Sequence, residues 1–275
     1  MELYKGFDAR RYLIERYPTT LFEEDQTKIM SSWDILCYHK FYQTFNKEWD
    51  NTNTILLEIG GGPCIYALIS AAPYVAEIYH TDYVESCCNE VLMWKNADPD
   101  AYNWSPYFRH VVSTLEGQVS LDAVAKRESQ LRRILKDPLT CDVRNEPIVP
   151  NMSKPVDIIC ANFSLETTLP TMTDFEHVMK VLFDMLNPKG FLLLLCSLGC
   201  SWYLIKEAKF PCIYLRLENI ENAAKKAGFV VRTVESKDKA LSGRNIYNDT
   251  TGHAFVVVQK PEQNQQEPEI HNSRV

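Results

Sequence analysis

The sequence lacks several features that mark specialised protein classes. None of its nine cysteines forms a C-x-x-C motif, and the six histidines are scattered rather than grouped. No stretch approaches the roughly 20 apolar residues that span a bilayer, and the charged segment from Met1 to Arg16 has no apolar signal-peptide core. These absences argue against a disulfide framework, a metal site and a membrane span. They predict a cytoplasmic protein.

Basic charge is also scarce. The 29 Lys and Arg residues face 36 Asp and Glu residues, which gives a formal net charge of −7. An acidic protein repels phosphate backbones unless its cations cluster. The most basic stretch, 126–136, also contains Glu128, which favours a solvated helix face over a nucleic-acid surface. We therefore expect a monomer whose partner is a small molecule and neither nucleic acid nor membrane.

Apolar runs alternate with helical patterns along the chain. Continuous apolar runs predict strands buried on both faces of a parallel sheet, at 54–60, 75–82, 139–143, 156–163 and 190–198. Helical spacing predicts helices at 8–17 (with Asp8 as N-cap), 25–46, 63–72, 84–96, 103–137 (in two pieces), 173–185 and 218–227. The alternation predicts an α/β fold with a doubly wound sheet and helices on both of its faces.

The two ends of the chain depart from this alternation. Residues 229–236 and 253–260 are rich in β-formers and predict a terminal antiparallel strand pair. Residues 261–275 have no apolar period, so we expect a disordered tail. The sequence thus predicts one domain over 1–260.

The stretch LLEIGGGPCIYALIS, residues 56–70, is the most informative part of the chain. Glu58 closes an apolar strand, and three glycines form the turn before a helix. Glycines there let a ligand approach the backbone closely. Two nucleotide-like cofactors use such a turn, a dinucleotide and S-adenosylmethionine (SAM).

The residues after the glycines separate these two cofactors. Ile65 stands where a dinucleotide fold has the third glycine of G-x-G-x-x-G, and Pro63 removes an amide that a pyrophosphate would use. SAM carries no phosphate and needs no phosphate cradle. The pattern favours SAM; a tight turn without any ligand is the structural alternative.

Two further acids end the next strands. Asp82 lies 20 residues after Gly62, where a carboxylate accepts hydrogen bonds from ribose hydroxyls. Capping the helix over 84–96 is an equally natural role for it. Asp142 would face the adenine of the cofactor with Val143 against the ring, or it would simply form a turn.

Several motifs, taken in order, resemble the nicotinamide, phenylethanolamine, indolethylamine and thioether methyltransferases. They are RRYLIERY, LLEIGGGPCIYALISA, EIYHTDY, DPDAYNWSPY, TCDV, NPKGFLLLL, SWYLIKEAKF and GHAFVVVQK, and they extend from about residue 8 to residue 260. The resemblance implies a SAM-methyltransferase Rossmann-like fold in which a helical cap, here residues 1–50, covers the cofactor. It implies an enzyme that transfers the methyl group of SAM to a small acceptor, leaving S-adenosylhomocysteine.

The resemblance also assigns residues to the cofactor. By position, the matching residues are Tyr12 and Tyr17 in the cap, Gly60, Gly61, Gly62 and Tyr66 in and after the loop, Asp82 and Tyr83 at the ribose and adenine, and Asp142 and Val143 beside the adenine. Without the family, the spacing of the two cap tyrosines also fits a buried helical face.

Four cysteines stand where relatives keep polar residues. Cys87 replaces an amide-bearing residue near the ribose. Cys196 and Cys212 replace an acid and a serine that hold nicotinamide, and Cys200 replaces an acid that faces phenylethanolamine. The last three predict an acceptor pocket that is less polar than in these relatives, and they put nicotinamide in doubt.

One amine-facing acid of the phenylethanolamine enzyme is kept as Glu166. At the mouth of the site it would hold an amine and take its proton; a solvated or helix-capping glutamate is the alternative. Tyr12 would place a hydroxyl near the sulfonium. The main reading is a SAM-dependent N-methyltransferase for a small amine or pyridine-like acceptor. A thioether or thiol acceptor, a SAM-binding protein without catalysis and, less strongly, a nicotinamide-dinucleotide oxidoreductase remain alternatives.

Overall fold

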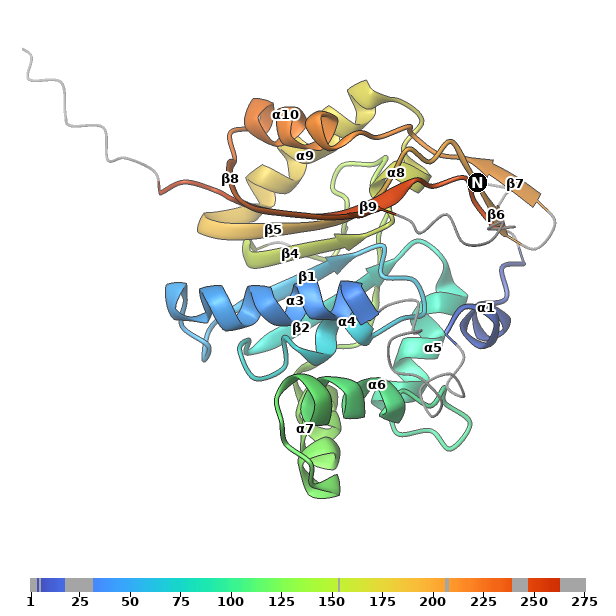
Figure 1. The fold of residues 1–275 in the computed structure, drawn as a ribbon, viewed down its shortest axis with the longest axis vertical. Helices are drawn as coiled ribbons and strands as arrows, with labels where there is room; N and C mark the ends of the chain where they lie inside the picture. The colour runs from blue at the N-terminus through green and yellow to red at the C-terminus, as the bar shows by residue number, and fades with distance from the viewer. Residues whose placement is uncertain are drawn as a thin grey trace, which may run out of the picture.

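A twisted sheet runs through the middle of the molecule, and helices pack against it (Figure 1). The computed structural model describes residue 4 and residues 6–17, 32–152, 154–205, 208–238 and 247–262. In these residues, seven strands pair in the order β3-β2-β1-β4-β5-β9-β8. Their bounds are β1 Ile55–Ile59, β2 Glu77–Asp82, β3 Leu139–Thr140, β4 Val156–Asn162, β5 Leu186–Leu198, β8 Val230–Asp238 and β9 Gly252–Gln259.

The strand directions agree with the sequence. Strands β1 to β5 pair in parallel, whereas β9 runs antiparallel to both β5 and β8. The predicted doubly wound sheet with a terminal antiparallel pair is therefore confirmed. The strand order reverses between β1 and β4, and ligands of open α/β sheets bind in the crevice at such a switch point.

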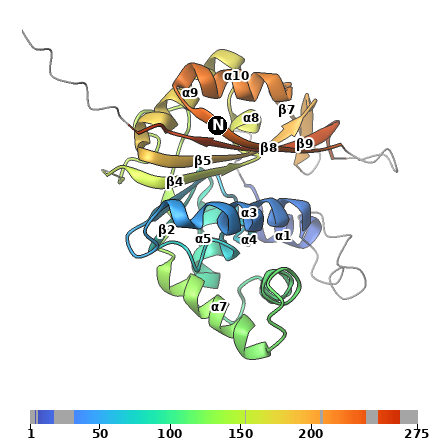
Figure 2. The same cartoon turned by 60° about the vertical axis from the view of Figure 1, so that its left-hand side comes forward.

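Helices cover both faces of the sheet because successive strand residues point to opposite sides. Along β5, Leu193 and Leu195 pack in one core cluster, and Leu192 and Leu194 in the other. Figures 1 and 2 show α9 (Met172–Met185) and α10 (Leu217–Ala227) on one face, and α3 (Ser32–Phe45), α4 (Tyr66–Ile69) and α5 (Glu85–Lys95) on the other. The predicted two-faced packing is confirmed.

The two described N-terminal helices pack in different places, one beside α5 and the other on a face of the sheet. In α1 (Ala9–Arg16), Asp8 is the N-cap: its carboxylate accepts a hydrogen bond from the Arg11 amide at 2.9 Å, as predicted. Helix α3 is fixed by aromatic packing, since the rings of Phe41 and Phe45 each lie 5.4 Å from that of Phe191 in β5. The first residues of the predicted 25–46 helix, 25–31, lie outside the described residues, as does 263–275 of the predicted tail.

Several predicted boundaries are wrong. The helix expected over 63–72 is only α4, because Gly62 adopts φ +63° and Ile65 is not helical. The strand expected over 139–143 ends at Thr140. The strand expected over 190–198 begins at Leu186, with an irregular start in which Lys189 has φ +65°.

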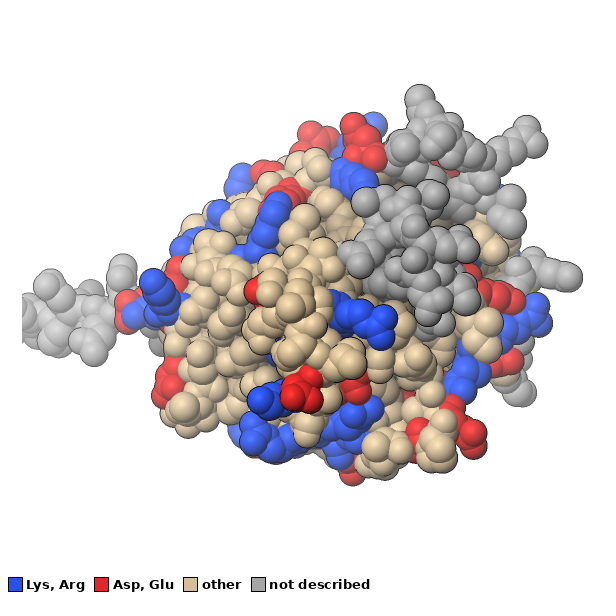
Figure 3. Space-filling model, turned by 60° about the horizontal axis from the view of Figure 1, so that its bottom comes forward, with Lys and Arg blue, Asp and Glu red and all other residues tan. Residues whose placement is uncertain are grey.

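The expected helical region 103–137 has three parts rather than two. Helix α6 (Ser105–Arg109) continues into a π-helix, η4 (His110–Leu115), and α7 (Leu121–Ile134) follows. Two of the four cations of α7 are paired: Arg127 with Glu116 at 2.8 Å and Arg132 with Glu128 at 3.3 Å. On the face in Figure 3, basic and acidic side chains are likewise interspersed. This arrangement fits the solvated-face reading.

Smaller elements complete the described chain. The 3-10 turn η3 (Asn46–Glu48) follows α3, and α8 (Leu165–Thr168) follows β4. Strands β6 (Trp202–Ile205) and β7 (Ala208–Pro211) form a hairpin that the sequence did not predict. Within the described ranges, no helix has both the length and the apolar character needed to cross a membrane.

Removing the Phe191 ring should loosen α3. Phe191 is 2% exposed and packs against Phe41, Phe45 and Trp49. We expect Phe191→Ala to lower the free energy of unfolding by about 3–5 kcal/mol, because it leaves a cavity in the core. Val119→Ala, at a side chain that is 87% exposed, is the control and should change little. Denaturant titration measures both, and equal effects would contradict this account of how α3 is held.

Candidate active site

A large cavity opens at the carboxyl ends of β1, β2, β4 and β5. Its volume is about 1190 Å³, which is larger than the 300–1,000 Å³ typical of a pocket for one drug-sized ligand. The strand order places it at the β1/β4 switch point. Its lining divides into one half over β1 to β3, including Gly60 and Asp82, and a second half over β4, β5 and β9, including Asn162 and Ser197.

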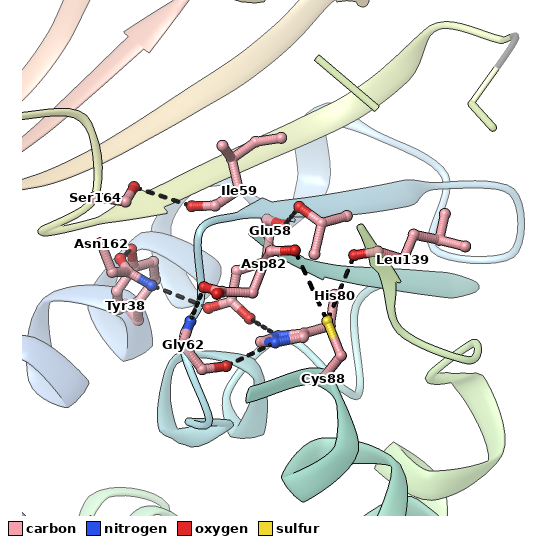
Figure 4. A network of polar contacts seen from close by, with 11 residues as sticks. Tyr38, Glu58, Ile59, Gly62, His80, Asp82, Cys88, Leu139, Asn162 and Ser164 are labelled. Carbon is pink, nitrogen blue, oxygen red and sulfur yellow. Dashed lines mark hydrogen bonds and ion pairs between the residues drawn. The ribbon is translucent and has the colours of Figure 1, made fainter. Parts of the chain in front are cut away.

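Beneath the cavity floor lies a buried polar network (Figure 4). Glu58 and His80 are register partners in β1 and β2, and His80 Nδ1 lies 2.6 Å from Glu58 Oε2. Asn162, at the end of β4, donates to Glu58 Oε1 at 3.0 Å and accepts a hydrogen bond from the Tyr38 hydroxyl of α3. One carboxylate therefore ties three strands together, and α3 joins the network through Asn162.

The same histidine holds the glycine turn. His80 Nε2 lies 2.9 Å from the carbonyl oxygen of Gly62. Both ring nitrogens thus lie within hydrogen-bond distance of an oxygen atom, one on the β1 carboxylate and one on the glycine turn. Burial lowers the pKa of His80, but the hydrogen bond and charge of Glu58 raise it more, and the net pKa is raised. Glu58 is 1% exposed, so this acid serves the loop rather than a ligand.

The glycines of the turn have different physical reasons. Gly60 and Gly62 adopt φ +64° and +63°, in the left-handed region that favours glycine. At Gly61 a Cβ would lie 2.4 Å from His80 Cε1 and 2.6 Å from Glu58 Oε2. All three glycines line the cavity, and a Cβ on Gly62 would meet nothing within 4 Å. The backbone here is open to a ligand, which is what a SAM site requires.

Asp82 both lines the cavity and organises its wall. Its carboxylate accepts hydrogen bonds from the amides of Gly62 and Val84, each at 2.8 Å. Val84 is the N-cap of α5, so the bonds link the glycine turn to the start of that helix. Burial raises the pKa of Asp82 although these amides lower it. The ribose role predicted for Asp82 remains a prediction, and its role at the helix start is visible.

Aromatic side chains from α1 close one side of the cavity. Tyr12 and Tyr17 both line it, with ring centroids 6.0 Å apart. The Tyr17 ring stacks on that of Tyr66 at 5.7 Å, and the Tyr17 carbonyl accepts a hydrogen bond from the Tyr102 hydroxyl. Burial raises the pKa of Tyr12 and that of Tyr17. The cap tyrosines predicted to contact SAM thus lie together with the predicted helix tyrosine.

The residues predicted to meet the adenine also converge on the cavity, as Tyr83, Cys87, Asp142 and Val143 all line it. Arg144 holds the Asp142 carboxylate at 2.8 and 2.9 Å and lies 5.1 Å from the Tyr83 ring centroid. Burial raises the pKa of Asp142, but these bonds lower it more. The Cys87 thiol is buried and its pKa is raised by burial, which favours packing over redox chemistry.

Two of the three cysteines predicted for the acceptor pocket lie there. Cys200 and Cys212 line the cavity, and a hydrogen bond between their thiols lowers the pKa of Cys200 and raises that of Cys212. Cys196 does not line it. In β5 its side chain points into the core cluster that holds Leu192 and Leu194, and the next residue, Ser197, faces the cavity instead. The strand's two-residue period decides this.

The sequence predicted Glu166 at the mouth of the site. In the structure it lies behind the cavity wall. It is 0% exposed and absent from the cavity lining. Its Oε1 accepts a hydrogen bond from the Ser197 amide at 2.7 Å, and its Oε2 has no partner among the described residues. Burial raises the pKa of Glu166 to about 7, although the Ser197 amide lowers it. It lies in the short helix α8, which the sequence did not predict.

Sequence reasoning missed other residues of the second half. Asp34 of α3, Phe163 after β4, Tyr203 of β6 and His253 of β9 all line the cavity. Asn162 and Phe163 have a signal in the sequence, since they end an apolar strand. Asp34 and His253 have none, because only the packing of α3 beside β9 brings them together, with His253 Nδ1 3.9 Å from Asp34 Oδ1.

Comparison with known proteins assigns the chain to a family. The family model described as NNMT/PNMT/TEMT family matches residues 1–261. The chain belongs to this family. It is 32% identical to human nicotinamide N-methyltransferase over 196 residues, 71% of this chain and 73% of the relative. It is 28% identical to pig phenylethanolamine N-methyltransferase over 260 residues, 94% of this chain and 89% of the relative.

Solved structures agree on the fold of this family member. A SAM-dependent methyltransferase from Clostridium acetobutylicum has a TM-score of 0.53 at 11% identity, covering 92% of this chain and 100% of the other. One from Methanosarcina mazei has a TM-score of 0.52 at 11% identity, covering 79% and 97%. These comparisons confirm the predicted family, the predicted fold and the predicted enzyme class, a SAM-dependent N-methyltransferase. The roles of individual residues stay predictions.

Substituting Gly61 tests the network under the loop. A Cβ at this position would collide with both members of the Glu58–His80 pair, so we expect Gly61→Ala to lower the free energy of unfolding by about 3 kcal/mol. Gly117→Ala is the control without a steric clash. Gly117, unlike Gly61, has a left-handed φ, +72°, but has open space around it, and its substitution should cost about 1 kcal/mol. Urea titration measures both, and a Gly61 effect no larger than the control would refute the steric account.

The buried Glu166 should make stability depend on pH. Its pKa is about 7 in the fold against an ordinary 4.5, so between these values the folded state holds a proton that the unfolded state releases. This contribution is complete below about pH 4.5 and is lost as the pH rises through 7, a change of about 3 kcal/mol. Glu166→Gln should abolish that part of the profile in urea titrations from pH 4 to 8. Parallel profiles for both proteins would contradict it.

Proposed function

We propose that this chain transfers the methyl group of SAM to the nitrogen of a small amine or pyridine-like acceptor. The observation that carries the proposal is the division of one cavity into two halves at the β1/β4 switch point. The half over β1 to β3 has an open glycine backbone and the carboxylate of Asp82. The half over β4, β5 and β9 has space left for a second, smaller molecule.

The first half fits SAM. We propose that Gly60, Gly61 and Gly62 contact its methionine part through their backbone, that Tyr12, Tyr17 and Tyr66 enclose it, and that Asp82, Tyr83, Cys87, Asp142 and Val143 hold its ribose and adenine. When bound, SAM supplies an electrophilic methyl group on a sulfonium. The chain then has to align the acceptor lone pair and exclude water, and the aromatic cover from α1 supports that role.

The second half sets the acceptor. The relatives' names indicate nicotinamide and phenylethanolamine as acceptors of those proteins. Here the thiols of Cys200 and Cys212 and the ring of Phe163 line the acceptor half, which supports an acceptor with few polar substituents. We further propose that the chain forms one domain over 1–260 and acts as a cytoplasmic monomer.

A panel assay tests the acceptor class. Purified full-length protein is incubated with methyl-labelled SAM and with primary amines, pyridines and thioethers, and labelled product is counted. We expect turnover on at least one nitrogen acceptor. Turnover on thioethers alone would replace the proposal with an S-methyltransferase, and SAM binding without any turnover would replace it with a binding protein.

Removing the Asp82 charge tests the cofactor half. Asp82→Asn should weaken SAM binding about 10–100-fold in calorimetry, because a charge-assisted hydrogen bond contributes about 1.5–3 kcal/mol. Asp98→Asn, at an exposed acid outside the cavity lining, is the control and should bind SAM like the wild type. Unchanged affinity in the Asp82 variant would remove this residue from the proposed site.

A further inference from the structure

Methyl transfer to an aliphatic amine requires that the amine first lose a proton, whereas transfer to a pyridine or thioether does not. This inference rests on the proposed function. An aliphatic amine is protonated at neutral pH and must lose a proton before its lone pair can react, whereas pyridine and thioether lone pairs are available. Because Glu166 lies behind the cavity wall, an amine acceptor needs a different group that faces the cavity.

His253 faces the acceptor half from β9. It lines the cavity, and its side chain is 32% exposed. It pairs in register with Ser197 of β5, so the two side chains lie on the same face of the sheet. The Phe163 ring packs edge-on against the imidazole at 4.9 Å. Asp34 Oδ1 lies 3.9 Å from Nδ1, and among the residues that the structure describes no hydrogen bond involves Nε2.

The charges around His253 come from every element packed against it. Asp34 is on α3, Glu166 is on α8, and Lys237 of β8 is its register partner, with Asp238 next along that strand. The Asp34 carboxylate, 4% exposed, lies on the Nδ1 side of the ring and orients it.

The other candidate groups of this half are less suited. The Cys212 thiol and the Tyr12 hydroxyl both have raised pKa values, and each would have to lose its own proton first. The Glu166 carboxylate does not reach the cavity surface. Imidazole is the side chain that takes and returns protons near neutral pH.

We propose that His253, oriented by Asp34, is the proton acceptor for a primary or secondary amine in the acceptor half of the cavity. The ammonium gives one N–H proton to Nε2, which leaves a neutral amine. The amine lone pair then forms the N–CH3 bond while the C–S bond breaks and its electron pair stays on sulfur. The product is again an ammonium, and the proton on His253 leaves to water.

Acceptor selectivity tests this assignment. His253→Gln should lower kcat/KM for 2-phenylethylamine about 100-fold, and that for pyridine less than about 3-fold. Adding free imidazole to His253→Ala should restore amine turnover at least about 10-fold. Asp34→Asn should lower the amine reaction about 10-fold. His177→Gln, at an exposed histidine of α9 paired with Glu146, is the control and should match the wild type on both acceptors.

A second readout needs no turnover. The Cε1–H resonance of His253, assigned by its loss in His253→Gln, should shift toward the imidazolium position when 2-phenylethylamine is added without SAM. Pyridine should cause no such shift. SAM affinity of the variants, measured by calorimetry, should stay within about 2-fold of the wild type and shows that they are folded.

The outcomes separate this proposal from the proposed function. Three outcomes would overturn the role of His253 and leave N-methylation standing. They are an equal loss of kcat/KM on amine and pyridine in His253→Gln, no loss on the amine, and a wild-type protein that methylates pyridine but no amine. Absence of turnover on every acceptor would overturn both.

Discussion

The buried pair of Glu58 and His80 is the interaction on which the site depends. It joins β1 to β2 at register, and through Asn162 it reaches β4 and α3. The other ring nitrogen of His80 lies 2.9 Å from the Gly62 carbonyl oxygen. A buried polar pair of this kind contributes little net stability, but losing one partner is costly because the other is left buried without a hydrogen bond. Its effect is therefore to fix the shape of the glycine turn, and the whole cofactor half is built around that turn.

The two halves of the cavity are assembled differently. The cofactor half takes its residues from the ends of consecutive strands and the turns after them, so each residue lies close in sequence to the strand that places it. The acceptor half combines α3, the end of β4, β5, the β6–β7 hairpin and β9. Segments that distant in sequence meet through the pairing of β5 with β4 and β9 and through the packing of α3 on the rings of Phe191 and Phe255.

Much of the fold was predictable. Continuous apolar runs identified the parallel strands, and the residues expected around SAM lie together on one cavity wall. The predicted boundaries and pocket residues are wrong where tertiary contacts override the preference of the local sequence. The helix expected over 63–72 begins only at Tyr66, because the bonds of Asp82 and His80 to Gly62 hold the preceding residues in a turn. Cys196 was assigned to the pocket by resemblance, and the alternation along β5 directs it into the core.

The sequence alone determined the fold class, the family and the place of the glycine turn, because periodicity and local motifs are properties of neighbouring residues. Only the tertiary structure decided which groups face the acceptor. It buried Glu166 behind the Ser197 backbone and brought His253 beside Asp34. No sequence period relates α3 to β9, since their approach follows from the packing of an N-terminal helix on strands from the C-terminal part of the chain.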